Sequence, residues 1–245
     1  MRANYKLQRL YSGSTLNEGA RVSLDKAQSN YLLNVLRLQN GSQLLLFNGK
    51  DGEWRTKLEL LGKKTAQLVC EKLERPQTPP STLLFCFAPL KVGRLDYMVQ
   101  KAVEMGAGVL QPVLTDFTQN HRLNMDKMRS WTIEAAEQCG VLALAQCNEP
   151  VKLSVLLENW EEDRALIFCD EGHGTDNPLP PLENVTSETT AVLIGPEGGF
   201  SDTERTSLRA KSFVHPVALG PRILRADTAA VAALAIVQAK LGDWR

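Results

Sequence analysis

The sequence predicts an α/β protein with two domains, a small β-barrel over residues 1–75 and a larger domain with a parallel sheet over residues 76–245. In the first part, short apolar runs are separated by Asn-Gly and Asp-Gly pairs, which favour the positive φ angles of tight hairpin turns. The second part alternates apolar runs with helical patterns, as parallel α/β sheets do. Between them, residues 74–81 contain three prolines, which disrupt both ladders and helices, so we expect a linker there.

The first domain is expected to be mostly strands, at Gln43–Phe47, Thr56–Leu61 and Thr65–Cys70. One short helix is expected at Asp25–Leu36, with its leucines facing the strands. A small barrel of this size is typical of RNA-binding modules. Five cations in this domain are candidates for phosphate contacts, with solvated surface charge as the alternative for each: Arg2, Arg9, Arg21, Lys26 and Arg37.

The second domain is expected to hold five strands, at Leu83–Ala88, Val109–Leu114, Ala165–Cys169, Ala191–Ile194 and Val214–Leu219. Its main helices are expected at Arg94–Met105, Asp126–Cys139 and Ala226–Leu241. The last helix is apolar nearly all round, which indicates burial on several sides. Either the core of its own domain or a homodimer interface would provide that burial.

Composition narrows the class of protein. The chain is 43% hydrophobic and 23% charged, which argues against global disorder. Apolar runs all fall short of the ~20 residues of a spanning helix, and the first residues lack the apolar core of a signal peptide, so we expect a cytoplasmic protein. The five cysteines form no CxxC pair and the three histidines are isolated, so we expect free thiols and no metal site.

The formal net charge of zero hides an asymmetry. Residues 1–75 carry a net charge of +6, and the remainder carries −6. A basic part joined to an acidic part is typical of a polyanion-binding module beside a different one, although chance would give the same pattern.

Two loops near the end of the chain have the residues of a ligand site. Leu193–Phe200 (LIGPEGGF) leaves an apolar strand, and Ser201 with Glu204 then forms a capping-box pattern for a helix. Leu219–Thr228 (LGPRILRADT) repeats the plan and adds two arginines, which are suited to phosphate, carboxylate or a base edge. Together they predict one pocket built largely of backbone, at the carboxyl end of a parallel sheet. Neither loop is a GxGxxG or P-loop motif, so a dinucleotide or triphosphate is not indicated, and a plain strand–turn–helix connection is the alternative.

These two motifs, LIGPEGGFSDTE and LGPRILRADTA, closely resemble those of the SPOUT superfamily of methyltransferases, and in particular the bacterial small-subunit ribosomal RNA uridine-N3 methyltransferases. The resemblance extends to VLRLQNGSQLLLFNGKDGEW at 35–54, similar to their PUA-like barrel. It also includes KVGRLDYMVQKAVEMGAGVLQPVLT at 91–115 and EAAEQCG at 134–140.

The resemblance implies a trefoil-knotted sheet, an obligate homodimer with the last helix in its interface, and S-adenosylmethionine as the methyl donor. Carried over by position, the cofactor site would comprise Leu193, Gly195, Pro196, Glu197, Gly198, Leu219, Gly220, Arg222, Ile223, Leu224 and Thr228. Lys91 and Arg94 join the candidate RNA contacts. The chain departs from the family pattern at Val141 and Leu142, where arginine is common, at Ala226-Asp227, where Thr-Glu is common, and at Asn30 or Tyr31, where histidine is common.

Methylation of uracil N3 requires removal of a weakly acidic proton and stabilisation of the resulting negative charge. Arg225 is the candidate for charge stabilisation, and Glu197 or Asp227 is the candidate proton acceptor. Thr228 would cap the last helix or bind a ligand. Two alternatives stay open: a related methyltransferase with another target, such as a tRNA ribose 2′-hydroxyl, and a non-catalytic RNA-binding assembly factor.

Overall fold

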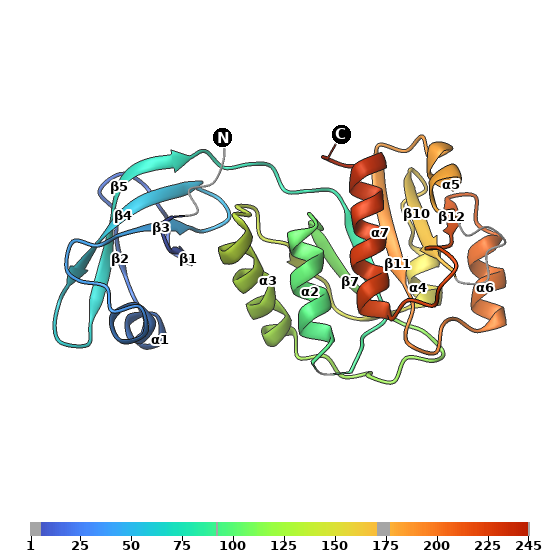
Figure 1. Cartoon of the computed structure of the whole chain (residues 1–245), viewed down its shortest axis with the longest axis horizontal. Helices are drawn as coiled ribbons and strands as arrows, with labels where there is room; N and C mark the ends of the chain where they lie inside the picture. Colours follow the sequence, from blue (N-terminus) through green and yellow to red (C-terminus); the bar gives the residue numbers. More distant parts are fainter. Residues whose placement is uncertain (1–5, 92, 171–176, 245) are drawn as a thin grey trace. The chain divides into compact units, whose positions relative to one another are not determined.

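The computed structural model describes residues 6–91, 93–170 and 177–244. The chain forms two compact units. The first comprises Met1–Pro79 together with Ala136–Leu144, and the second comprises Pro80–Ala135 together with Ala145–Arg245. Figure 1 shows the chain coloured along the sequence and labels most of its helices and strands.

The first unit contains a curled five-stranded sheet with the strand order β1-β3-β4-β5-β2. Strands β1 and β3 are parallel, and the other neighbouring strands are antiparallel. Apolar side chains from β3, β4 and β5 form its core, as the barrel prediction requires. The strands are β1 (Arg9–Tyr11), β2 (Arg21–Ser23), β3 (Gln43–Phe47), β4 (Glu53–Leu60) and β5 (Ala66–Arg75).

The turn between β3 and β4 contains the two predicted pairs, Asn48-Gly49 and Asp51-Gly52. Gly49 and Gly52 both have a φ of 81°. A Cβ atom on Gly52 would lie 2.5 Å from the carbonyl oxygen of Arg75, so a larger residue would displace β5. The side chain of Asn48 accepts hydrogen bonds from the backbone N–H groups of Lys50 and Asp51 and closes the turn.

The predicted helix at residues 25–36 is present in two parts. Helix α1 (Lys26–Asn30) begins with a capping box between Asp25 and Gln28, and a π-helical turn, η1 (Tyr31–Val35), continues it. Leu32 is completely buried in the core of the unit. The sequence pattern gave the position and the buried face of this helix but not the change in its hydrogen bonding.

The expected linker is shorter than predicted. Glu74 and Arg75, which we expected in the linker, are the last residues of β5. Both side chains form ion pairs, Glu74 with Arg55 and Arg75 with Glu53. Helix and strand are absent from residues 76–83, where the three prolines lie.

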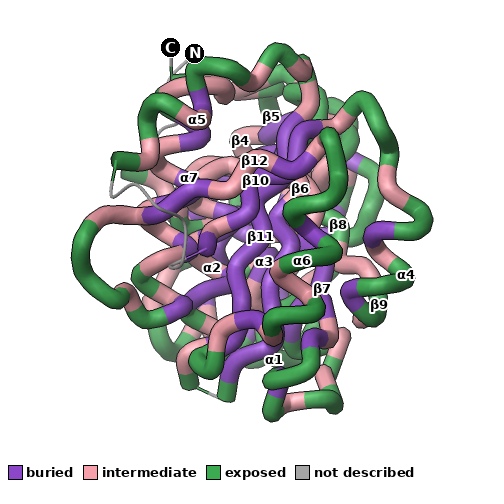
Figure 2. The backbone as a smooth tube through the Cα atoms, turned by 90° about the vertical axis from the view of Figure 1, so that its right-hand side faces the viewer, coloured by how far each residue is buried: buried purple, intermediate pink, exposed green. Residues whose placement is uncertain are grey.

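The second unit is built around a parallel sheet with the strand order β12-β10-β11-β6-β7-β8, and β9 pairs with β7. The neighbouring strands of this sheet are parallel, which confirms the predicted α/β class. Figure 2 shows the buried central strands of this sheet in purple. The strands are β6 (Leu84–Phe87), β7 (Val109–Leu114), β8 (Gln146–Cys147), β9 (Val151–Lys152), β10 (Arg164–Cys169), β11 (Thr189–Ile194) and β12 (Val214–Val217).

Helices cover this sheet, and α7 packs against α2 and β11. The buried residues of α7 include Ala230, Ala233, Leu234 and Val237, while several of its other small residues are half-buried. Among the described residues, none of the helices is both long enough and apolar enough to cross a membrane. The helices are α2 (Leu95–Glu104), α3 (Met125–Cys139), α4 (Leu153–Glu158), α5 (Leu179–Glu183), α6 (Asp202–Arg209) and α7 (Ala226–Lys240).

Candidate active site

The first loop of the site connects β11 to α6. It begins at Gly195, directly after the strand, and Ser201 caps α6 in the predicted capping box with Glu204. A Cβ atom on Gly195 would lie 2.6 Å from the ring of Phe200, so glycine is needed for the loop to fold back on itself. The ring of Phe200 in turn packs edge-on against Phe168 of β10, with 5.0 Å between the ring centroids.

The second loop connects β12 to α7. Gly220 has a φ of 98°, in the left-handed region that favours glycine, and Arg225 is the N-cap residue of α7. Strand β10 lies between β11 and β12 in the sheet, and all three run in parallel. Both loops therefore leave the same edge of the sheet, on either side of the end of β10.

The two loops surround one hollow at this edge of the sheet. Seven of the predicted cofactor residues line it: Gly195, Pro196, Leu219, Gly220, Arg222, Ile223 and Leu224. The hollow is also lined by Cys169 and Asp170 at the end of β10, Phe200 of the first loop and Arg205 of α6, among others. Ile223 is 85% exposed, so it forms an open side of the hollow. The other four predicted residues lie elsewhere: Leu193 is buried in β11, Glu197 and Gly198 are at the exposed turn of the first loop, and Thr228 is exposed in α7.

Charged residues at the base of this hollow were not predicted. The carboxylate of Asp170 is fully buried, and it forms ion pairs with Arg205 and Arg209 of α6. Two signals were available in the sequence, an aspartate directly after the buried strand ALIFC and two arginines four residues apart in a helix. Burial raises the pKa of the neighbouring Cys169 thiol to about 12, so this cysteine stays protonated and is a poor nucleophile.

The three candidate catalytic residues lie at the two loops. Arg225 is exposed at the start of α7. Asp227 is half-buried in the first turn of α7, where its carboxylate accepts a hydrogen bond from the backbone N–H of Thr228 at 3.0 Å. The suggestion that Thr228 caps α7 is wrong, because Arg225 occupies the N-cap position and no side-chain cap bond forms there.

Glu197 lies beside a second hollow. Its carboxylate is 3.7 Å from a guanidinium nitrogen of Arg94, and Lys91 and Gln119 complete the lining. Glu197 and Arg94 are both partly exposed, at 34% and 41%. The two candidate RNA contacts of this unit therefore lie next to one candidate proton acceptor.

The candidate RNA contacts of the first unit have different environments. Lys26 and Arg37 are exposed, and Arg21 is exposed in an ion pair with Glu59. Arg2 lies outside the described residues. Arg9 does not fit the expectation of a phosphate contact, because it is only 4% exposed and is fully engaged inside the unit.

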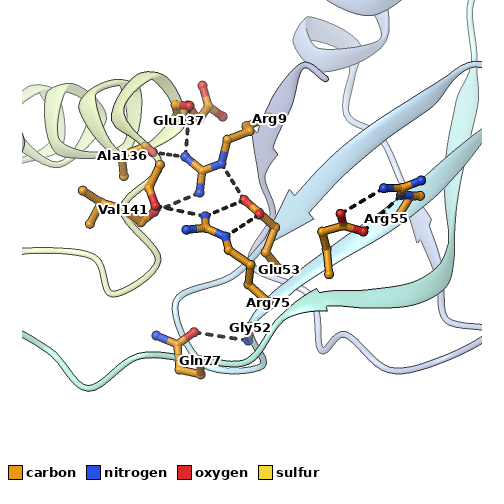
Figure 3. Close-up of polar contacts among 11 residues, drawn as sticks. Arg9, Gly52, Glu53, Arg55, Arg75, Gln77, Ala136, Glu137 and Val141 are labelled. Atoms are coloured by element: carbon orange, nitrogen blue, oxygen red, sulfur yellow. Dashed lines mark hydrogen bonds and ion pairs between the residues drawn. The ribbon is translucent and has the colours of Figure 1, made fainter. Parts of the chain in front are cut away.

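Arg9 belongs to a buried network that Figure 3 shows in detail. The carboxylate of Glu53 accepts hydrogen bonds from Arg9 and Arg75. The two arginines also donate to backbone carbonyl oxygens of residues 136–141: Arg9 to Ala136, Glu137 and Val141, and Arg75 to Gly140. Cations at the end of a helix satisfy its free carbonyl groups, so this network holds the end of α3 in the first unit.

The described part of the chain contains no group of three or more histidine, cysteine, aspartate or glutamate residues placed to hold a metal ion. The chemistry that these residues can support themselves is binding by backbone, charge stabilisation by arginine and proton transfer to a carboxylate.

Comparison with known proteins agrees with a methyl-transfer site. Residues 77–238 match a family model described as an RNA methyltransferase domain, and residues 24–70 match an RNA methyltransferase PUA domain. The fold and these matches define the class, a PUA-containing RNA methyltransferase.

Three similar proteins indicate to which RNA methyltransferase family the chain belongs. The chain is 34% identical to ribosomal RNA small subunit methyltransferase E of Synechocystis sp., over 91% of this chain and 74% of the relative. It is 29% identical to a Legionella pneumophila protein solved with the bound cofactor S-adenosylmethionine, with a TM-score of 0.81 and coverage of 95% and 97%. The same fold occurs in ribosomal RNA small subunit methyltransferase E of Neisseria gonorrhoeae, bound to S-adenosylmethionine, at 24% identity, a TM-score of 0.82 and coverage of 98% and 100%. This chain belongs to the ribosomal RNA small subunit methyltransferase E family.

Proposed function

We propose that this protein transfers a methyl group from S-adenosylmethionine to N3 of a uridine in small-subunit ribosomal RNA. The observation that carries the proposal is the hollow formed by the two Gly-Pro loops, with Glu197 on the first loop and Arg225 and Asp227 where the second loop joins α7. Membership of the methyltransferase family supports the reaction class and the RNA substrate. We infer that the target is N3 of a uracil from the resemblance of the two loop motifs to those of uridine-N3 methyltransferases.

The hollow fits the methyl donor. Its walls combine apolar side chains, such as Ile194, Leu219 and Leu224, with backbone at Gly195 and Gly220. Apolar walls suit an adenine ring, and backbone groups supply the hydrogen bonds that orient a small ligand. When bound, S-adenosylmethionine supplies an electrophilic methyl group on a positively charged sulfur. We place its binding residues at the two loops. They comprise the seven predicted lining residues together with Leu193 at the end of β11, Glu197 and Gly198 in the first loop, and Thr228 at the start of α7.

The protein's own residues would then handle the proton and the charge. A carboxylate, Glu197 or Asp227, accepts the proton from uracil N3 as the new N–C bond forms and the S–C bond breaks. Arg225 holds the uracil and stabilises the negative charge that develops on its carbonyl oxygens. Because N3 lies on the base-pairing edge, the target uridine is unpaired or flipped out of its helix.

We assign residues 1–75 to the barrel and residues 76–245 to the methyltransferase domain. Cations of both domains would bind the RNA. In the barrel, Lys26 and Arg37 are exposed, and in the second domain Lys91 and Arg94 lie beside Glu197. We further propose a homodimer through α7, whose half-buried alanines would allow close approach of a second copy. The trefoil knot remains part of the proposal, and the strand order β12-β10-β11-β6 is compatible with it. A ribosomal RNA substrate places the protein in the cytoplasm.

Methyl transfer to purified RNA tests this function. The protein is incubated with labelled S-adenosylmethionine and small ribosomal subunits or their RNA, and the RNA is digested to nucleosides for mass spectrometry. We expect the label in 3-methyluridine. Label in a 2′-O-methylated nucleoside would support the related-enzyme alternative, and binding of RNA without any transfer would support the assembly-factor alternative.

A further inference from the structure

The base of the donor hollow contains a buried carboxylate whose role the mechanism above does not use. Asp170 directly follows β10, and its side chain has no exposed surface. Arg205 approaches one carboxylate oxygen at 2.8 Å, and Arg209 approaches the other. Burial of a charge is costly unless it is paired, so this arrangement has to be held by specific contacts.

Arg205 makes a second contact in addition to its ion pair with Asp170. Its Nε atom donates a hydrogen bond to the carbonyl oxygen of Phe200 at 3.2 Å, while its Nη1 atom pairs with Asp170. Its other terminal nitrogen lies 3.5 Å from the position where a Cβ atom on Gly199 would be. The guanidinium of Arg205 therefore joins the end of β10 to the end of the glycine loop.

Phe200 transmits this contact to the rest of the loop. Its ring packs on Phe168 of β10 and also occupies the space that a side chain at Gly195 would need. The loop is thus held at both ends, at Gly195 by the ring of Phe200 and at Phe200 by Arg205. Gly195, Phe200 and Arg205 all line the hollow.

We propose that Arg205, held by Asp170 and supported by Arg209, is a positioning residue that keeps loop 195–200 in the shape that binds the methyl donor. Planar guanidinium groups can donate to two acceptors in fixed directions, which a lysine ammonium does not reproduce. The proposal rests on the function proposed above. Asp170, Arg205 and Arg209 would affect the binding of the donor, and other residues would carry out the methyl transfer itself.

The test compares donor affinity in three variants of the full-length protein. Calorimetry measures the Kd for S-adenosylmethionine, and methylation assays give kcat and the KM for donor and RNA. For Arg205→Ala we expect the donor Kd and KM to rise by on the order of 10-fold or more, the effect of losing a charged hydrogen bond. At saturating donor, kcat and the KM for RNA should stay within about twofold. Arg129→Ala is the matched control, because Arg129 is an exposed helical arginine that pairs with Asp126 on α3.

Arg205→Lys keeps the proposal testable if the alanine variant does not fold. Lysine retains the charge beside Asp170 but not the two-directional fork, so we expect an intermediate Kd. An unchanged donor Kd in folded Arg205→Ala, or a wild-type Kd in Arg205→Lys, would overturn the positioning role. If the unaltered protein itself does not bind S-adenosylmethionine, the proposed function fails first, and the inference fails with it.

Discussion

The Nε atom of Arg9 donates a hydrogen bond to Oε1 of Glu53 at 2.6 Å, and both side chains are buried in the first unit. Burial lowers the pKa of Arg9, whereas the carboxylate of Glu53 opposes that effect. The guanidinium also lies over the ring of Phe47, at 4.4 Å from its centroid. An arginine in a basic domain thus serves the packing of the domain, and the exposed cations Lys26 and Arg37 stay candidates for RNA binding.

Substitution of Arg9 should lower the free energy of unfolding of the first unit. Arg9→Met leaves the buried carboxylate of Glu53 with one partner fewer, and breaking a buried pair costs about 3–5 kcal/mol. Urea denaturation, with hydrogen exchange of the β3 and β4 amides, measures the change. Arg21→Met is the control, since Arg21 and Glu59 form an exposed, solvent-screened pair that should contribute far less to stability. Equal effects of the two substitutions would contradict the structural role of Arg9.

The same network predicts a loss of stability in acid. Burial alone would raise the pKa of Glu53, but Arg75 and Arg9 outweigh burial and hold that pKa below its ordinary value of 4.5. The folded state therefore favours the ionised carboxylate. Its contribution is fully present above pH 4.5 and is lost as the pH falls through the lowered pKa. Urea denaturation from neutral to acidic pH should show a steeper fall for the wild type than for Glu53→Gln, and parallel curves would contradict the assignment.

Gly195 should be intolerant of even a methyl group. In Gly195→Ala the new Cβ atom would lie 2.6 Å from the Phe200 ring, which would have to move and take the loop with it. We expect the affinity for S-adenosylmethionine to fall by at least about 10-fold, as measured by calorimetry. Gly13→Ala serves as control, because its Cβ atom would have no neighbour within 4 Å. Unimpaired donor binding by Gly195→Ala would show that this loop is not part of the donor site.

Arg225 should affect the chemical step and leave the fold intact. Its side chain is exposed and makes no cap bond to α7, so Arg225→Ala should unfold at the same temperature as the wild type. Without the cation, the charge on the uracil oxygens loses its partner, and we expect kcat to fall by about 100-fold or more. Single-turnover methylation with saturating donor measures this step. Normal turnover would remove Arg225 from the mechanism.

The sequence was most informative where local chemistry determines the structure. The capping box of Ser201 and Glu204, the turn at Asn48-Gly49 and the strand Gln43–Phe47 lie where the pattern predicted them. The two Gly-Pro loops were also found from sequence, because glycine, proline and a following helix cap are local signals. Their convergence on one hollow follows from the position of β10 between β11 and β12.

What the sequence did not reveal depends on contacts between distant residues. Strands β1 and β2 have three residues each, too few for a periodic pattern, and β1 is fixed by parallel pairing with β3. Asp170 gains its partners from α6, more than 30 residues later in the chain. In the sequence, Arg9 cannot be told from a surface cation, because its burial depends on the distant residue Glu53 and the end of α3. Burial of charged residues by such pairs has no local signature.

Nucleoside analysis of ribosomal RNA tests the central claim most directly. Small-subunit RNA is purified from a strain that lacks the gene, from its parent and from a complemented strain, and the nucleosides are quantified by mass spectrometry. We predict that 3-methyluridine disappears from the small-subunit RNA of the deletion strain and returns on complementation, but not with the Arg225→Ala variant. Persistence of 3-methyluridine in the deletion strain, or loss of a different modified nucleoside, would contradict the account.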